Sequence, residues 1–221
     1  MRPAAGWWAA AKHRGSESVR SAILAGGTAS RFDGSPKGLE LIGGDRILDR
    51  LIQPLRAATG KLPVMIANAP DAADWHSDLE VVGDAIRNCG SLGGLYTALT
   101  ISEGPVLVVA WDMPFVPREI FEDLIKCFEN HDACVPESGG PNLGLEPLCA
   151  VYGPNCIDPV RKQLVDEDFR MSGFFNSVDM AKLPFEQVAK HGDPDTIFFN
   201  VNSPDDLTRA QELWRSQHDR S

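Results

Sequence analysis

One loop decides the fold of this chain: Leu24-Ala25-Gly26-Gly27-Thr28-Ala29-Ser30-Arg31-Phe32-Asp33-Gly34-Ser35-Pro36-Lys37. An apolar run at 19–24 leads into it and predicts a buried strand. Gly26 and Gly27 let backbone amides approach a ligand without an intervening Cβ, and successive amides in such a turn form an anion site. Arg31 and Lys37 add two cations, and the lysine is a mobile point charge suited to a phosphate. The loop therefore predicts phosphate binding just beyond the first strand.

Two familiar nucleotide-binding loops do not match this segment. No Gly-Lys-Ser/Thr follows the glycines, which excludes a P-loop, and the segment lacks the GxGxxG spacing of a dinucleotide-binding turn. A bare Gly-Gly pair is also common in structural turns, so the prediction of phosphate binding depends on the two cations in the same loop.

Strands and helices alternate along the rest of the chain. We expect strands at 62–67, 79–82, 106–110, 133–136, 147–152 and 197–201, and helices at 45–58, 91–101, 118–128, 155–165 and 204–214. Asp45 is the expected N-cap of the first helix, and Ser203 that of the last, with Pro204 at its first position. The alternation predicts an α/β fold in three layers, α/β/α, with a mainly parallel sheet. The run 106–110 is the most continuously apolar, which favours the centre of the sheet.

A second chemical feature is Asp112, directly after that central strand. In open α/β sheets ligands bind beyond the carboxyl ends of the strands, which makes the loops after Leu24, Ala67, Val82 and Ala110 the expected site. Mg²⁺ prefers one or two carboxylates together with phosphate oxygens and water. Asp112 is therefore a candidate Mg²⁺ ligand, with a turn aspartate as the alternative.

Composition excludes several classes of function. The 221 residues carry a net charge of −10, and no Lys/Arg cluster offers a nucleic-acid surface. No apolar run approaches the length of a membrane span, so we expect neither nucleic acid nor membrane as a partner. Five dispersed cysteines without a CxxC pair favour reduced thiols in a cytoplasmic protein and make zinc binding improbable.

The first 18 residues differ from the rest in carrying two tryptophans, several alanines and mostly basic charges. A flexible extension is the favoured interpretation, with a transit peptide as the alternative. Residues 19–217 are expected to form a single domain.

In order along the chain, five motifs resemble those of the molybdenum cofactor guanylyltransferases, which have the nucleotide-diphospho-sugar transferase-like (Rossmann-like) fold. They are Leu24-Ala25-Gly26-Gly27 with Ser30-Arg31, Gly34 and Lys37-Gly38; Gly90-Ser91-Leu92-Gly93-Gly94; Asp112 with Pro114; Glu146-Pro147-Leu148; and Asn200-Val201-Asn202-Ser203-Pro204. The chain departs from the family pattern at four positions. Phe32 stands where Met is usual, Pro36 where Asp is usual, Trp111 where a small residue is usual, and Glu146 where Gln is usual.

The resemblance implies transfer of GMP from GTP to the phosphate of molybdopterin, with Mg²⁺ as cofactor. It implies nucleotide contacts at Leu24, Ala25, Gly26, Gly27, Lys37, Asn68, Asp84 and Asp112, catalytic roles for Arg31, Lys37 and Asp112, and acceptor contacts at Arg170, Asn200 and Asn202. For Arg170 a surface ion pair with the neighbouring acids is an equal alternative. Other proteins of molybdenum cofactor biosynthesis, or target apoenzymes, are the protein partners that the resemblance implies.

Three alternatives remain open on the sequence alone. The first is a cytidylyltransferase, because Ser35-Pro36-Lys37 is similar to the corresponding segment of that related family, although the double glycine at 26–27 favours guanine. Another nucleotidyltransferase of this fold, acting on a sugar phosphate or alcohol phosphate, is the second. A non-catalytic nucleotide-binding regulatory protein is the third, and the joint presence of Arg31, Lys37 and Asp112 speaks against it.

Overall fold

The molecule is built around one seven-stranded sheet. The computed structural model describes residues 18–26, 31–32, 35–139 and 144–218, with the backbone alone at 31, 32 and 35. The strands are β1 (Arg20–Leu24), β2 (Arg31–Phe32), β3 (Ser35–Pro36), β4 (Leu41–Ile42), β5 (Asp45–Arg46), β6 (Val64–Ile66), β7 (Val81–Val82), β8 (Val106–Ala110), β9 (Ala133–Pro136), β10 (Cys149–Tyr152) and β11 (Met180–Leu183). The helices are α1 (Ile47–Thr59), α2 (Gly90–Ile101), α3 (Arg118–Phe128), α4 (Ile157–Val165), α5 (Phe185–Val188), α6 (Pro194–Ile197) and α7 (Pro204–His218). Short 3-10 turns are η1 (Lys37–Leu39), η2 (Ala72–Asp74), η3 (Pro154–Cys156), η4 (Phe175–Ser177) and η5 (Ala189–His191).

The strand order is β11-β9-β10-β8-β1-β6-β7, which puts β8 at the centre as its apolar sequence predicted. Only β10 runs antiparallel to its neighbours. Leu24 of β1 pairs with Ala110 of β8 on one side and with Ile66 of β6 on the other. The carboxyl ends of these strands are therefore level, and their loops open at one edge of the sheet.

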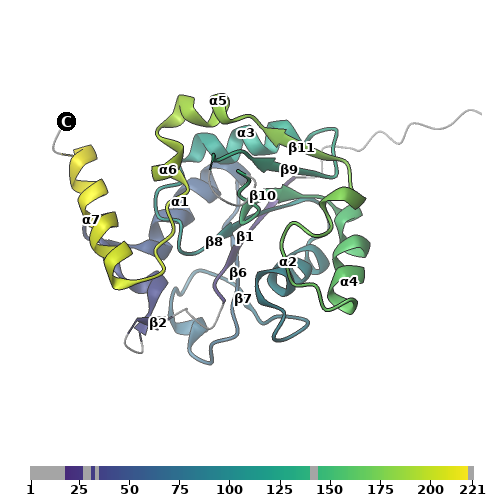
Figure 1. The fold of residues 1–221 in the computed structure, drawn as a ribbon. Helices are drawn as coiled ribbons and strands as arrows, with labels where there is room; N and C mark the ends of the chain where they lie inside the picture. Colours follow the sequence, from purple (N-terminus) through teal and green to yellow (C-terminus); the bar gives the residue numbers. More distant parts are fainter. Residues whose placement is uncertain (1–17, 27–30, 33–34, 140–143, 219–221) are drawn as a thin grey trace, which may run out of the picture.

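Helices cover both faces of this sheet, which confirms the three-layer α/β/α fold (Figure 1). The apolar stripes of α1 and α3 form one core cluster with the sheet, and those of α2 and α4 form the other. Helix α2 lies close to β1, as Gly94 shows. A Cβ added at this glycine would lie only 3.2 Å from Leu24 Cδ2. The glycine-rich segment thus brings this helix down onto the strand that carries the loop.

The expected strand at 197–201 is wrong. Its first residue ends the helical turn α6, and the chain continues to Val201 outside the sheet. The Asp193 side chain accepts a hydrogen bond from Asp195 N, and Pro194 occupies the first helical position, so the local signals for a helix start are stronger than the apolar run. Phe198 and Val201 are buried by packing on neighbouring elements instead of by strand pairing.

Several other boundaries also differ from expectation, by two to four residues at one end or both, as for β6, β7, α4 and α7. Asp45 is not a helix N-cap but lies in the β4–β5 hairpin, paired with Ile42, and α1 begins at Ile47 with no side-chain cap. The strand expected at 147–152 begins at Cys149, because a turn in which Cys149 N donates to Glu146 O occupies the preceding residues. The edge strand β11 had no signal in the sequence, since only the last of its four residues, Leu183, is buried.

The predicted start of the last helix is confirmed. Asp206 N donates to Ser203 Oγ (3.2 Å), while the Asp206 carboxylate accepts from Ser203 N (2.9 Å). This reciprocal capping fixes the angle at which the chain enters α7. Helix α7 then packs on the β4–β5 hairpin, where a Cβ at Gly43 would lie 2.1 Å from the Trp214 ring.

Trp111 is the most constrained side chain next to the carboxyl edge. It is 1% exposed, and its ring stacks on Trp75 with centroids 5.0 Å apart. A Cβ at Gly38 would lie 2.3 Å from Trp111 Cε3. The indole therefore fills the space that any other residue at 38 would need, and it holds the first turn after Lys37 against the end of β8.

Replacement of Gly38 by alanine is expected to destabilise the protein by about 1–3 kcal/mol, because a rigid stacked indole must move to admit one methyl group. Chemical denaturation monitored by circular dichroism measures the loss. Gly26→Ala is the matched control, since nothing described lies within 4 Å of its Cβ position. Equal free energies of unfolding for the two variants would contradict the packing constraint.

Candidate active site

Three polar side chains from distant parts of the sequence meet at the carboxyl edge of the sheet. Lys37 Nζ donates to Asp112 Oδ2 at 2.5 Å and to Asn202 Oδ1 at 2.9 Å. The Lys37 side chain is 6% exposed and that of Asp112 is 13% exposed. Burying an ion pair costs desolvation energy, which an exposed pair largely avoids. A buried pair at the end of the central strand is therefore a candidate functional site.

The backbone around these side chains explains why they meet. Asp112 follows β8 by two residues, and Trp111 N donates to Leu24 O (3.2 Å), which joins the ends of β8 and β1. Val201 N donates to Asp112 O (2.9 Å), which draws the C-terminal segment across the end of the central strand. Asn202 is the next residue, and its side chain thereby reaches the lysine.

The second carboxylate oxygen of Asp112 has no hydrogen-bond partner. Asp112 Oδ1 is buried, and no group within the described residues bonds to it. An unpaired buried carboxylate oxygen is costly unless a ligand satisfies it. Within the described ranges no three His, Cys, Asp or Glu side chains converge. One carboxylate oxygen of this kind fits a hard divalent cation that takes its remaining ligands from phosphate and water.

Asn68 and Asp84 form a second polar pair at the same edge, after β6 and β7. Asn68 Nδ2 donates to Asp84 Oδ2 (2.6 Å), and Asp84 N donates to Asn68 Oδ1 (2.9 Å). Burial raises the pKa of the Asp84 carboxyl, and the hydrogen bond from Asn68 opposes this shift. The structure thus brings together the two residues expected to hold the nucleoside, on the β6–β7 side of Asp112.

The start of the first loop is only partly free for a ligand. Ala25 N donates to Ile66 O (2.8 Å) and Leu24 O accepts from Trp111 N, so these two backbone groups hold the sheet edge together. Gly26 is the first residue past these bonds and is exposed. Nothing described lies within 4 Å of a Cβ placed on it. Gly27 lies outside the described residues, as does the Arg31 side chain.

Arg170 is not brought to this site. Its side chain is 79% exposed and makes two hydrogen bonds to the Asp168 carboxylate, at 2.8 and 2.6 Å. These bonds hold the pKa of Asp168 at about 2. The surface ion pair that the sequence left as an alternative is therefore what the structure contains.

The two asparagines of the C-terminal motif differ in their contacts. Asn200 Nδ2 donates to Phe198 O (2.9 Å), which shapes its own turn. Asn202, which the sequence also assigned to the acceptor side, accepts a hydrogen bond from Lys37 Nζ. No sequence pattern predicted this contact, since it joins residues 165 positions apart. The Trp75–Trp111 stack likewise had no signal in the sequence.

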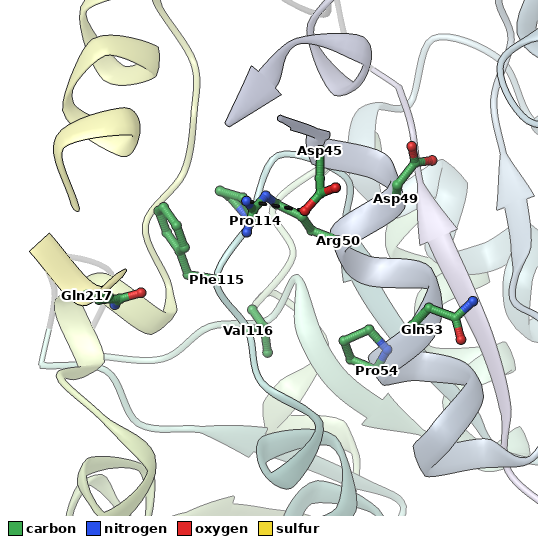
Figure 2. Close-up of a pocket in the computed structure, with 9 residues that line it drawn as sticks. All are labelled: Asp45, Asp49, Arg50, Gln53, Pro54, Pro114, Phe115, Val116 and Gln217. Atoms are coloured by element: carbon green, nitrogen blue, oxygen red, sulfur yellow. Dashed lines mark ion pairs between the residues drawn. The ribbon is translucent and has the colours of Figure 1, made fainter. Parts of the chain in front are cut away.

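A separate hollow lies between α1, the 114–116 loop and the end of α7 (Figure 2). It encloses about 570 Å³. Its one cation, Arg50, donates to Ile42 O and pairs with Asp45 at 3.6 Å. Two carboxylates and an engaged arginine would repel a polyphosphate, and neither Lys37 nor Asp112 lines this space. The candidate active site is therefore the open sheet edge and not this hollow.

No helix in the described ranges is long and apolar enough to cross a membrane. All five cysteines are free thiols.

Comparison with known proteins agrees with this geometry. The family model of the MobA-like NTP transferase domain matches residues 21–181. A probable molybdenum cofactor guanylyltransferase of Natranaerobius thermophilus is 31% identical over 202 residues, which covers 89% of this chain and 96% of the relative. A second, from Pelotomaculum thermopropionicum, is 32% identical over 192 residues, covering 86% of this chain and 91% of the relative.

Solved structures show the same likeness. Molybdopterin-guanine dinucleotide biosynthesis protein A of Archaeoglobus fulgidus superimposes with a TM-score of 0.75 at 27% identity, covering 90% of this chain and all of that one. A 4-diphosphocytidyl-2C-methyl-D-erythritol synthase from Anaerococcus prevotii, at 13% identity and a TM-score of 0.67, shares the fold over 89% of this chain and 96% of its own. This chain therefore belongs to the MobA-like NTP transferase family and is a nucleotidyltransferase.

Proposed function

We propose that the protein transfers GMP from GTP to the phosphate of molybdopterin, giving the guanine dinucleotide form of the cofactor and pyrophosphate. The observation that carries the proposal is the buried Lys37–Asp112–Asn202 contact at the carboxyl edge. The similarity to probable molybdenum cofactor guanylyltransferases supports the choice of substrates. The proposal assigns the activity to one domain, residues 19–217, in the cytoplasm.

The reaction needs positioning and charge neutralisation more than acid–base catalysis. An acceptor phosphate is already ionised, so one of its oxygens attacks the α-phosphorus of GTP directly while the bond to the β-phosphate oxygen breaks. In this proposal Lys37 neutralises the triphosphate, and its hydrogen bond to Asn202 orients the ammonium group. Asn68 and Asp84 hold the nucleoside. Asp112 would hold a Mg²⁺ ion, which supplies charge neutralisation to the phosphates when bound.

Pyrophosphate release tests the proposal. Purified protein is given molybdopterin, Mg²⁺ and each of the four NTPs in turn. GTP is expected to support release and yield a guanine dinucleotide product by mass spectrometry. A cytosine product would make the protein a cytidylyltransferase, as the similarity of Ser35-Pro36-Lys37 to that family allows. The proposed location of the transfer site would not change. Absence of release with all four nucleotides would contradict the proposed reaction.

Asp112→Asn is expected to reduce turnover by at least about 100-fold, because a neutral amide binds and neutralises a divalent cation much more weakly than a carboxylate does. This substitution keeps an oxygen acceptor for Lys37. Asp112→Ala is less suitable, since it leaves a buried ammonium group without its partner and costs stability. Steady-state kinetics over a Mg²⁺ titration measures the effect. Wild-type turnover in the variant would remove Asp112 from the site.

For Lys37, replacement by alanine is expected to weaken GTP use strongly, and replacement by arginine to restore it only in part. A planar guanidinium fork does not reproduce a point charge held between Asp112 and Asn202. The comparison is of kcat/KM for GTP. Unchanged kinetics in Lys37→Ala would show that this loop is a structural turn.

Gly26→Ala is expected to penalise GTP more than CTP, because a purine needs more of the open space at this turn than a pyrimidine. A wrong base that leaves a buried polar group unpaired typically costs about 1–3 kcal/mol, or tenfold to a hundredfold in preference. Both nucleotides compete in one reaction, and the products are separated by chromatography. An equal loss for the two nucleotides would exclude base reading at this position.

A further inference from the structure

The first turn of α7 lies directly after the lysine contact of the candidate active site. Asn202 Oδ1 accepts from Lys37 Nζ at 2.9 Å, and the helix begins two residues later at Pro204. Asn202 is an exposed residue, so burial does not set the direction of its side chain. The position of its amide oxygen therefore depends on the bonds that hold its backbone.

The backbone of Asn202 is held from both sides. Val201, which is fully buried, donates from its N–H to Asp112 O at 2.9 Å. Asn202 N donates to Asp206 Oδ2 at 3.0 Å. The same carboxylate oxygen accepts from Ser203 N at 2.9 Å and from Ser203 Oγ at 2.8 Å. One oxygen of Asp206 thus gathers three donors from the two residues that precede the helix.

Helix capping explains only part of this arrangement. In a capping box, the third residue of the helix bonds back to the backbone N–H of the N-cap residue, whose hydroxyl bonds to the backbone N–H of that third residue. The bonds between Ser203 and Asp206 satisfy this pattern. The bond from Asn202 N lies outside the pattern, because Asn202 precedes the N-cap residue. This additional bond ties Asn202 to the first turn of the helix.

The Asp206 carboxylate is both fixed and charged. Its helix is anchored to the core through Ala210, which is fully buried in one cluster with Val201. Burial raises the pKa of the Asp206 carboxyl, but hydrogen bonds from Ser203 and Asn202 outweigh this effect and lower the pKa overall. The group is therefore ionised at neutral pH, and hydrogen bonds to an ionised acceptor are stronger than those between neutral groups.

The contact with Asn202 fixes the direction of the Lys37 ammonium group. An ammonium group has three N–H donors in a tetrahedral arrangement. Two of those of Lys37 are bonded, to Asp112 Oδ2 at 2.5 Å and to Asn202 Oδ1 at 2.9 Å. Fixing two N–H directions also fixes the third, which under the proposed function meets a phosphate oxygen of GTP. A shift of Asn202 would turn this third donor away from the phosphate.

We propose that Asp206 is a positioning residue of the transfer site, which holds the backbone of Asn202 and thereby orients the Lys37 ammonium group toward the phosphates. The connection runs from Asp206 through the backbone and the side chain of Asn202 to Lys37. Asp206 touches no substrate and acts only through Asn202. Its effect on turnover rests on the proposed function, whereas its effect on the ammonium group does not.

The first test is a double-mutant cycle in the full-length protein with Mg²⁺. The kcat/KM for GTP and the free energy of unfolding are measured for wild type, Asp206→Ala, Asn202→Ala and the double variant. Each single variant is expected to lower kcat/KM about 10- to 100-fold. In the Asn202→Ala background, Asp206→Ala is expected to lower kcat/KM by no more than about twofold further, while its cost in unfolding free energy stays the same.

Two further variants separate positioning from charge. Asp206→Asn keeps an oxygen acceptor for Asn202 N and is expected to restore most of the activity that Asp206→Ala loses. Asp205→Ala is the matched control, since this neighbouring acid of the first turn is exposed and its side chain makes no hydrogen bond among the described residues. It removes the same charge from the same end of the helix and is expected to leave kcat/KM unchanged.

A second readout needs no turnover. The Hζ–Nζ signal of the Lys37 ammonium group is recorded by NMR and is assigned by its loss in Lys37→Arg. Asp206→Ala is expected to shift or broaden this signal as Asn202→Ala does, whereas Asp205→Ala leaves it in place. A purely structural role of Asp206 in capping α7 would lower stability without moving the signal.

Several outcomes overturn the inference. Independent losses of kcat/KM in the two single variants would do so, as would an equal effect in Asp205→Ala or an unchanged Lys37 signal in Asp206→Ala. If Asp206→Ala does not fold, Asp206→Glu decides, because it keeps the charge but moves the carboxylate by one methylene. This variant is expected to lower kcat/KM and to shift the Lys37 signal, and wild-type values of both would contradict the inference. A wild-type protein without guanylyl transfer would defeat the proposed function, and the Lys37 signal alone would then decide the positioning role.

Discussion

The buried ion pair between Lys37 and Asp112 is the contact on which the rest of the site depends. Such a pair contributes little net stability, because desolvation offsets the attraction, yet removing one partner typically costs about 3–5 kcal/mol. The surrounding structure is arranged to keep both groups in place. Asp112 follows the central strand β8, and the Trp111 ring packs against Gly38, next to Lys37. Asn202 accepts a hydrogen bond from the lysine. A charge pair held this way is suited to phosphates, where neutralisation is required.

The central strand β8 divides the carboxyl edge of the sheet into two halves. The loops after β1, β6 and β7 lie on one side of Asp112, and the β9–β10 hairpin lies on the other. Because β10 is antiparallel, its first residue and the last residues of β8 lie at the same edge.

Local signals predicted most of the fold. The bounds of β8 and α3 and the Ser203 cap agree with the sequence, because a continuous apolar run, an amphipathic period and a capping residue each act over a few positions. The sequence also named Asp112 and Lys37 as candidate site residues, and in the structure their side chains are in contact. The contact between Lys37 and Asn202 was not predicted, because it depends on the path of residues 198–203, where an apolar run that suggested a strand instead packs outside the sheet. The Trp75–Trp111 stack was missed for the same reason, since tertiary packing alone joins these residues.

A double-mutant cycle on Lys37 and Asp112 tests most directly whether the two residues act as one unit. Lys37→Met, Asp112→Asn and the double variant are compared in free energy of unfolding and in kcat for guanylyl transfer. The account predicts strong coupling: the double variant is less destabilised than the sum of the single variants by at least about 1 kcal/mol, and its turnover is close to that of the worse single variant. Additive losses in both measurements would contradict this prediction, because they would show that Lys37 and Asp112 contribute independently to stability and to turnover.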